Sequence, residues 1–171
     1  SVDDVQLLSS GLNEFAFDLL AELNKAEPKN RFFSPYSISL ALSMTYAGAD
    51  GSTAQEMADV FHYPAALADL HGTMNSLDQQ LYKTPEYMED EEGNFKLNVA
   101  NALWGQAGYA FKQDYLDEVA AAYGAGLKLV DYIQATDASR KQINDWVEKE
   151  TEEKIKDLLP AGSLNPDTRL V

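Results

Sequence analysis

Apolar residues near the N-terminus recur at intervals of three and four, which is the spacing of one face of an amphipathic helix. This pattern predicts a helix from about Asp3 to Lys25, with inward residues Val5, Leu8, Leu12, Phe15, Leu19 and Leu23. The same spacing returns after Pro64 and predicts a helix that ends at Thr84-Pro85, with inward residues Leu67, Leu70, Met74, Leu77 and Leu81. Each helix should bury one face against a neighbouring element.

A helix of a different kind is predicted to start at Ser34-Pro35. A serine hydroxyl can accept from the free N–H groups of the first turn, and proline is well tolerated as the first helical residue. Residues 38–47 are apolar or small on nearly every side, so this helix belongs inside a domain. The apolar run 31–33 before it predicts a brief buried strand. Residues 53–56 (TAQE) predict a capping box that opens the next helix, with Met57, Val60 and Phe61 inward.

In the second half of the chain, apolar residues recur with the period of strands in some stretches and with the period of helices in others. Apolar and polar residues alternate over 95–104 and again over 127–133, which is the period-two pattern of β-strands. Helical spacing occupies 111–123 between them. Thr136 or Asp137 can cap the last long helix, whose inward residues are Ile143, Trp146 and Val147. Because helices and strands are interspersed without a steady alternation, the sequence predicts the α+β class.

Composition fits one folded core and excludes several classes of partner. The chain has 171 residues, of which 45% are hydrophobic, and 28 acidic against 13 basic residues give a formal net charge of -15. This charge repels nucleic acid and anionic lipid, so we expect no nucleic acid and no membrane as partners. No apolar run approaches the roughly 20 residues that span a bilayer, and the N-terminal residues lack the regions of a signal peptide. Cysteine is absent, which excludes disulfides and cysteine-based zinc sites.

No arrangement of residues for catalysis or for cofactor binding is visible in the sequence. His62 and His71 are the only histidines, and neither has a partner three or four residues away that would form a metal-binding pair. Ser52 lacks the flanking glycines of a nucleophile elbow, and no phosphate-binding glycine pattern occurs. The acidic run 89–92 lacks the ligand spacing of a calcium loop. We therefore expect no cofactor, no metal and no enzymatic activity.

Three long blocks of the sequence, in order, resemble the serpins. The first is FFSPYSISLALSMTYAGADGSTAQEM. The second, LNVANALWGQAGYAFKQDYLDEVAAAYGAGLKLVDY, is similar to the family's second and first central-sheet strands with the helix between them. The third, INDWVEKETEEKIKDLLPAGSLNPDTRLV, is similar to helix F and its return toward the third strand. The resemblance covers essentially the whole chain. It implies the N-terminal part of an α+β serpin fold, with helices A to F, the first strands of central sheet A and a short strand of sheet B.

The resemblance also implies roles for particular residues. Ser34 and Ser37 match the family's shutter serines, which lie beneath the point where the central sheet parts. Local sequence alone favours a plain N-cap and a small packing residue, whereas the resemblance favours the shutter role. The helix at 137–150 matches the one that lies across the sheet face, through Ile143, Trp146 and Val147. A central-sheet strand would contain Asn101, Leu103 and Trp104.

The matched blocks make up less than half of a serpin. We therefore expect residues 1–171 to be the N-terminal portion of a single serpin domain, truncated where a central-sheet strand begins at 168–171. The reactive loop and its scissile bond would lie outside this chain, in the remaining C-terminal part of the serpin, as the same chain or as a companion chain. The family resemblance favours an extracellular protein.

The implied function is inhibition of a serine-type endopeptidase, or of a cysteine-type one, through insertion of the cleaved reactive loop into the central sheet. Two alternatives stay open. One is a non-inhibitory serpin-fold protein acting as a carrier, storage protein or chaperone, and the other is a free-standing acidic interaction domain. Some serpins bind heparin through a basic helix, but residues 64–92 hold seven acids and one base, Lys83. We expect no heparin binding through this helix.

Overall fold

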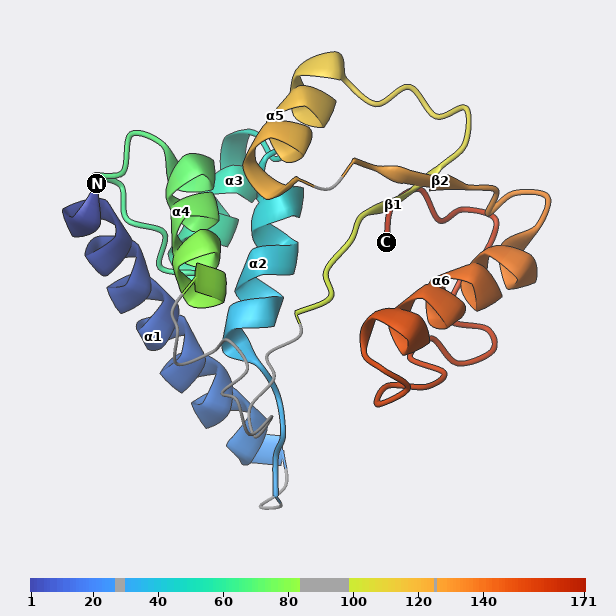
Figure 1. The fold of residues 1–171 in the computed structure, drawn as a ribbon, viewed down its shortest axis with the longest axis horizontal. Coiled ribbons are helices and arrows are strands. Elements are labelled where there is room, and N and C mark those ends of the chain that lie inside the picture. The colour runs from blue at the N-terminus through green and yellow to red at the C-terminus, as the bar shows by residue number, and fades with distance from the viewer. Residues whose placement is uncertain (27–29, 84–98, 125) are drawn as a thin grey trace. The chain divides into compact units, whose positions relative to one another are not determined.

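The computed structural model describes four stretches of the chain, residues 1–26, 30–83, 99–124 and 126–171 (Figure 1). The chain divides into two compact units, Ser1–Lys96 and Leu97–Val171. We call the first the helical unit and the second the strand unit. The predicted helix end at Thr84-Pro85, the acidic run 89–92 and the strand residues 95–98 lie outside the described residues.

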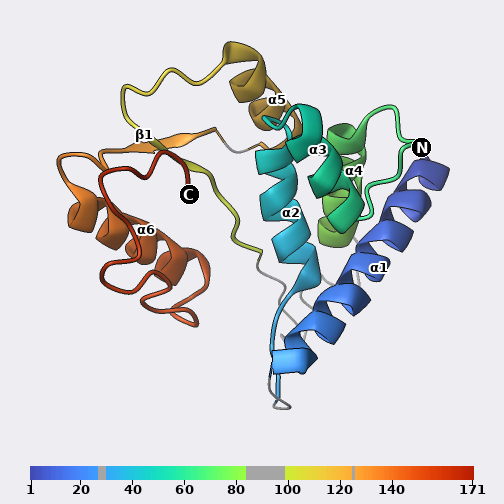
Figure 2. The ribbon, with the colours of Figure 1, turned by 180° about the vertical axis from the view of Figure 1, so that it is seen from behind.

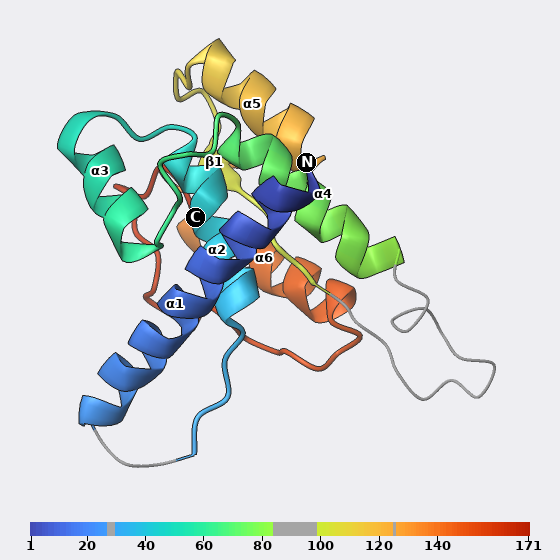
Figure 3. The ribbon, with the colours of Figure 1, turned by 90° about the vertical axis from the view of Figure 1, so that its left-hand side faces the viewer.

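The described part of the helical unit contains four helices, α1 (Val2–Ala26), α2 (Pro35–Tyr46), α3 (Gly51–Val60) and α4 (Leu70–Lys83). α1 packs against both α2 and α4 (Figures 1 and 3). The predicted apolar face of α1 is the buried one, since Leu8 is completely buried and Leu12 and Phe15 nearly so. Met44 of α2 and Met74 of α4 are also buried. The period of the sequence therefore predicts both the extent of α1 and the face that it buries.

Aromatic rings and one glycine join the end of α3 to α1. The ring centroid of Phe61 lies 4.7 Å from that of Phe15 and 5.5 Å from that of Tyr63. A Cβ at Gly11 of α1 would lie 2.1 Å from the backbone oxygen of His62. Only glycine permits this approach, so α1 lies directly against the turn that follows α3.

The predicted strand at 31–33 is absent from the structure. These residues have no strand conformation, and Phe32 is fully exposed. A short extended run is stable only when other strands pair with it, and no described residue does so. Val60, predicted to face inward, is also largely exposed.

Two helices of this unit begin at other positions than those predicted. The N-cap of α3 is Asp50, whose Oδ1 accepts from the first backbone N–H of the helix at 2.8 Å, and the predicted capping box at 53–56 lies inside the helix. α4 begins at Leu70 and not at Pro64, because Asp69 Oδ1 accepts from a backbone N–H of the first turn at 2.7 Å. An aspartate satisfies these free N–H groups as well as a serine or threonine does, so both helices start beside one.

The strand unit consists, over its described residues, of β1 (Trp104–Gln106), α5 (Gln113–Tyr123), β2 (Lys128–Val130) and α6 (Thr136–Glu150). β1 and β2 are parallel, with Trp104 opposite Lys128. On its other side β1 forms an antiparallel bridge from Gly105 to Leu170. Trp104 and Val171 exchange backbone hydrogen bonds of 2.8 and 2.9 Å. β1 therefore has backbone partners on both sides, and Figure 2 shows the C-terminal segment beside it.

α6 packs against the two strands (Figure 2). Its buried residues form a core with the strands, which comprises Trp104, Val130, Tyr132, Ile143 and Val147. α5 ends directly before Gly124, where the predicted helical stretch 111–123 also ends, and Gly124 caps the helix with a left-handed φ of 62°.

The regular elements of this unit are shorter than the alternating pattern predicts. Of the described residues 99–104 in the first predicted strand, only Trp104 has strand conformation, and the strand predicted over 127–133 is limited to β2. Regular strand pairing requires a neighbouring strand, and β1 and β2 pair over three residues each. The predicted cap of α6 is also wrong, because the N-cap is Ala135 without a side-chain cap bond and Thr136 Oγ1 donates back to the Tyr132 carbonyl at 2.5 Å.

Candidate functional site

The two predicted shutter serines form a connected pair at the start of α2. The Ser34 oxygen accepts from the backbone N–H of Ser37 at 3.2 Å, and its hydroxyl donates to Ser37 Oγ at 3.0 Å. Ser34 is exposed and Ser37 half-buried within the described residues. Ser34 is therefore an N-cap, as its sequence position predicts, and it also fixes the Ser37 side chain.

The residues assigned to the central-sheet strand do not all lie in it. Trp104 is the first residue of β1 and is 4% exposed. Leu103 is equally buried but precedes the strand, and its carbonyl accepts from the Lys128 N–H at 2.9 Å. Asn101 also precedes the strand and is half-buried. Of these three residues, only Trp104 has strand conformation.

The predicted inward face of α6 meets Trp104. Ile143 and Val147 are buried in the same cluster as Trp104, and Trp146 packs against that cluster from its edge. The two indole rings lie 5.9 Å apart at 72°, an edge-to-face arrangement. The sequence therefore predicted correctly which side of α6 is buried in this unit.

A polar network links β1 to the segment before α6, and sequence reasoning missed it. Gln106 is buried, and its Oε1 accepts from the Tyr132 N–H at 2.7 Å. Its Nε2 donates to the Ala107 carbonyl at 2.9 Å and to Asp131 Oδ1 at 3.2 Å. The Tyr132 hydroxyl donates to the Trp104 carbonyl at 3.0 Å, and burial raises the pKa of Tyr132 to about 12. Gln106 thus holds the chain between β2 and α6 against β1.

Asp131 organises the turn that follows β2. Its Oδ1 accepts from the backbone N–H groups of Gln134 at 3.0 Å and Ile133 at 3.1 Å. The hydrogen bond from Gln134, followed by the one from Gln106, lowers the pKa of the Asp131 carboxyl, because these donors favour the ionised form. The one available sequence signal was an aspartate inside the predicted strand 127–133, because aspartate is depleted in strands and commonly binds the backbone two residues on.

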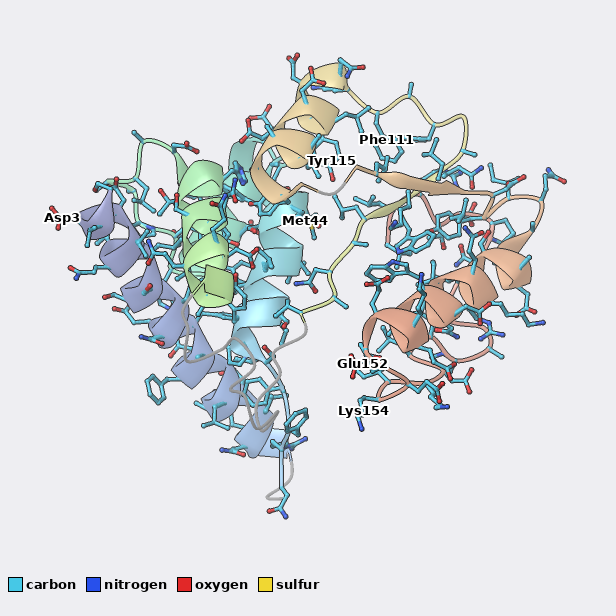
Figure 4. All side chains as sticks on the ribbon, in the orientation of Figure 1. Asp3, Met44, Phe111, Tyr115, Glu152 and Lys154 are labelled. Carbon is cyan, nitrogen blue, oxygen red and sulfur yellow. The ribbon has the colours of Figure 1, made fainter. Side chains whose placement is uncertain are left out.

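The chain that leaves α6 returns along the helix and is held by it. Asn144 Nδ2 donates to the Leu159 carbonyl at 2.9 Å, and Asn144 Oδ1 accepts from the Leu159 N–H at 2.8 Å. Arg140 Nη1 donates to the same carbonyl at 2.9 Å. The turn between the helix and this clamp contains Glu152 and Lys154 (Figure 4). A buried asparagine on the helix therefore fixes the path of the chain toward β1.

The described residues hold no group of three metal-ligating side chains in reach of one ion. His62, one of the two histidines, lies instead beside α1, with Nε2 2.8 Å from Asp18 Oδ2 and Nδ1 3.4 Å from Glu14 Oε2. No helix in the described ranges is long and apolar enough to cross a bilayer. The interactions described around β1 are backbone pairing and side-chain packing.

Comparison with known families decides the relationship. A family model described as "Serpin (serine protease inhibitor)" matches residues 10–171. The chain belongs to the serpin family. The fold agrees, since serpin structures align with nearly the whole of it.

Two curated serpins show how far the likeness extends. A leukocyte elastase inhibitor of Xenopus tropicalis is 39% identical over 165 residues, which cover 96% of this chain and 42% of that protein. A serpin-like protein of Methanosarcina mazei is 36% identical over 167 residues, which cover 96% of this chain and 38% of that protein. The chain therefore spans less than half the length of these relatives.

Solved structures give the same picture. An uncleaved ovalbumin aligns with a TM-score of 0.78 and 26% identity over 92% of this chain and 44% of its own. A structure titled as a tumour suppressing serpin aligns with a TM-score of 0.82 and 25% identity over 99% of this chain and 43% of its own. The fold is thus that of the N-terminal part of a serpin, mostly helical with a small parallel sheet.

Proposed function

We propose that these residues are the N-terminal portion of a single serpin domain that inhibits a serine-type endopeptidase. In this proposal the protease cleaves a reactive loop supplied by the rest of the domain, and the loop inserts as a new strand into the sheet that contains β1. The observation that carries the proposal is the family match over residues 10–171. It is supported by a relative, 39% identical, that is named as an elastase inhibitor.

The energy of strand insertion is large enough for such a mechanism. Roughly a dozen new backbone hydrogen bonds at a net ~1 kcal/mol each contribute on the order of 10 kcal/mol. A protease domain is stable by about 5–15 kcal/mol. Insertion can therefore distort the active site of a protease that is still attached to the loop.

Within this mechanism the described residues would form the part that receives the loop. We assign Ser34 and Ser37 to the shutter and α6 to the helix across the sheet. The connected serine pair at the start of α2 and the packing of Ile143 and Val147 beside Trp104 support these assignments. We expect no heparin activation through α4, because the sequence of residues 64–92 is strongly acidic.

The test is to incubate the full-length protein that carries these residues with a panel of serine proteases and one cysteine protease. An SDS-resistant complex with a serine protease is the expected result. The 171-residue chain alone is the control and should form no complex, because it would lack the reactive loop. Cleavage of the full-length protein without a complex would favour the non-inhibitory alternative instead.

Replacement of Ser37 tests the shutter assignment. Ser37→Phe adds a ring at the first turn of α2, and overpacking of this kind costs about 1–3 kcal/mol. If Ser37 controls sheet opening, the full-length variant should contain more loop-linked polymer and should consume more inhibitor per protease. Ser34→Ala is the matched variant, with an expected loss of ~1 kcal/mol for the cap. A Ser37→Phe protein that melts lower yet keeps the original stoichiometry and stays monomeric would show that the assignment is wrong.

A further inference from the structure

Lys128 lies over both tryptophans of the strand unit. It is the first residue of β2 and stands in register with Trp104 of β1. Its Nζ is 5.6 Å from the ring centroid of Trp104 and 5.6 Å from that of Trp146 on α6. One side chain therefore touches aromatic rings from a strand and from the helix that covers it.

This placement differs from that of other lysines in the structure. Lys141 pairs with Asp137 at 2.9 Å, and Lys156 pairs with Glu148 at 2.9 Å. Lys128 forms no ion pair with any described residue, although acidic residues outnumber basic ones by 28 to 13 in the chain. In such an acidic protein, an exposed lysine without a carboxylate partner is evidence that the indole faces hold it.

The physical basis is the attraction of a cation to the negative face of an aromatic ring, which is strongest for tryptophan. Two rings at 72° to each other present two such surfaces to the same ammonium group. The charged end of Lys128 stays near water, since the residue is exposed, while its carbon stem can cover the ring edges. The contact therefore adds to the apolar packing of α6 without burying a charge.

We propose that Lys128 is a positioning residue that pins α6 to β1 and β2. α6 covers these strands, so its hold on them should determine how readily the sheet rearranges. The consequence for inhibition rests on the proposed function, because a helix across the sheet has to yield when a new strand enters. Loss of the charge should therefore loosen α6 first and alter inhibition second.

The experiment measures amide hydrogen exchange of residues 136–150 in the full-length protein, without protease. Lys128→Met keeps most of the stem and removes the charge, and we expect α6 to exchange about fivefold faster. That factor corresponds to about 1 kcal/mol, since 1.4 kcal/mol is tenfold. Lys128→Arg keeps a cation that can lie on both rings and should restore exchange to within about twofold of the original. Lys128→Gln provides a second uncharged variant and should behave like Lys128→Met.

Lys141→Met is the matched control, since it removes the same charge from the exposed side of α6 and should change exchange by less than about twofold. Unchanged exchange in both uncharged variants would overturn the proposal. Equal acceleration in Lys128→Met and Lys128→Arg would overturn it too, because the cation would then not be the cause. The stoichiometry of inhibition is measured separately. If the full-length protein inhibits no protease but Lys128→Met still exchanges faster, the proposed function is refuted. The proposal that Lys128 holds α6 against β1 and β2 then stands.

Discussion

The helical unit and the strand unit are stabilised by different kinds of contact. In the helical unit the core is made by apolar faces that repeat along the helices, such as Leu8, Phe15 and Met74. In the strand unit a smaller apolar cluster is joined by buried amides that bind backbone groups far away in sequence. Gln106 and Asn144 each bridge two segments in this way. The first kind of contact can be read from local periodicity, whereas the second depends on which segments meet.

This difference has an energetic consequence. An apolar face tolerates many substitutions that keep its volume, because burial depends on area and not on direction. A buried amide cannot be exchanged in the same way, since its loss leaves donors or acceptors unpaired inside the protein. The helical unit should therefore respond to changes of volume, and the strand unit to changes of single polar groups.

The largest effect is expected in the helical unit. Leu8→Ala leaves a cavity at a completely buried position and should lower the free energy of unfolding by about 2–5 kcal/mol. Its neighbour Leu7 is 41% exposed and provides the control, since Leu7→Ala should cost much less. Urea unfolding followed by circular dichroism measures both. Equal losses in the two variants would mean that the buried face of α1 does not carry the stability.

A smaller but still substantial effect should follow from one amide in the strand unit. Gln106→Leu preserves the approximate size of the side chain but leaves the Tyr132 N–H unpaired, which should cost about 1–3 kcal/mol. Gln113→Leu is the control, because Gln113 is exposed and bonds only within its own helix. Hydrogen exchange of β1 and β2 detects the loss. A Gln106→Leu protein as stable as the original would remove the distinction between the two units.

Two buried serines, one in each unit, should change the stability of the protein in opposite directions when they are replaced by alanine. Ser39 of the helical unit is completely buried, and its hydroxyl has no hydrogen-bond partner among the described residues. Ser139 of the strand unit is also buried, at 3% exposed, and its hydroxyl donates to the Asp131 carbonyl at 3.0 Å. Ser39→Ala should stabilise the protein by about 1 kcal/mol, and Ser139→Ala should destabilise it by up to about 1 kcal/mol. Thermal unfolding of both variants measures the signs, and two shifts in the same direction would contradict the comparison.

The helices were predicted well because their signals are local. The pattern from Asp3 to Lys25 corresponds to α1 at Val2–Ala26, since each apolar residue of a helix has its neighbours three and four positions away. Helix starts were less accurate, because any nearby aspartate can serve as the cap, as Asp50 and Asp69 do. The sequence contains several residues that could cap each helix, and the tertiary structure determines which of them does so.

The extents of the strands and the polar network could not be predicted from local patterns. β1 is limited to Trp104–Gln106 by partners that lie more than twenty positions further on, at Lys128 and Leu170. Gln106 lies beyond the alternating pattern of residues 95–104, and it is buried beside Tyr132 and Asp131, to which it is hydrogen-bonded. Of the candidate site, the inward face of α6 followed from its helical period, while the network depends on contacts that only the fold creates.

The smallest effect expected is a pH dependence of the strand unit that arises from Asp131. The hydrogen bonds to Asp131 hold the pKa of its carboxyl below the ordinary value for an aspartate. A lowered pKa in the folded state means that the carboxylate contributes stability above about pH 4, which is lost as the pH falls through the folded pKa. Asp131→Asn should therefore weaken the acid sensitivity of the strand unit. Unfolding midpoints between about pH 5 and about pH 2 measure this, with Asp145→Asn on the exposed side of α6 as the control. An identical acid dependence in the original and in Asp131→Asn would show that this carboxylate is not responsible.

The edge-to-face contact of Trp104 and Trp146 has a practical consequence. These are the two tryptophans of the chain, and one belongs to a strand while the other belongs to the helix that covers it. Any separation of helix from strand changes the surroundings of both indoles together. The intrinsic fluorescence of these residues therefore reports on the contact between α6 and β1. It can be followed without a label and on the timescale of mixing.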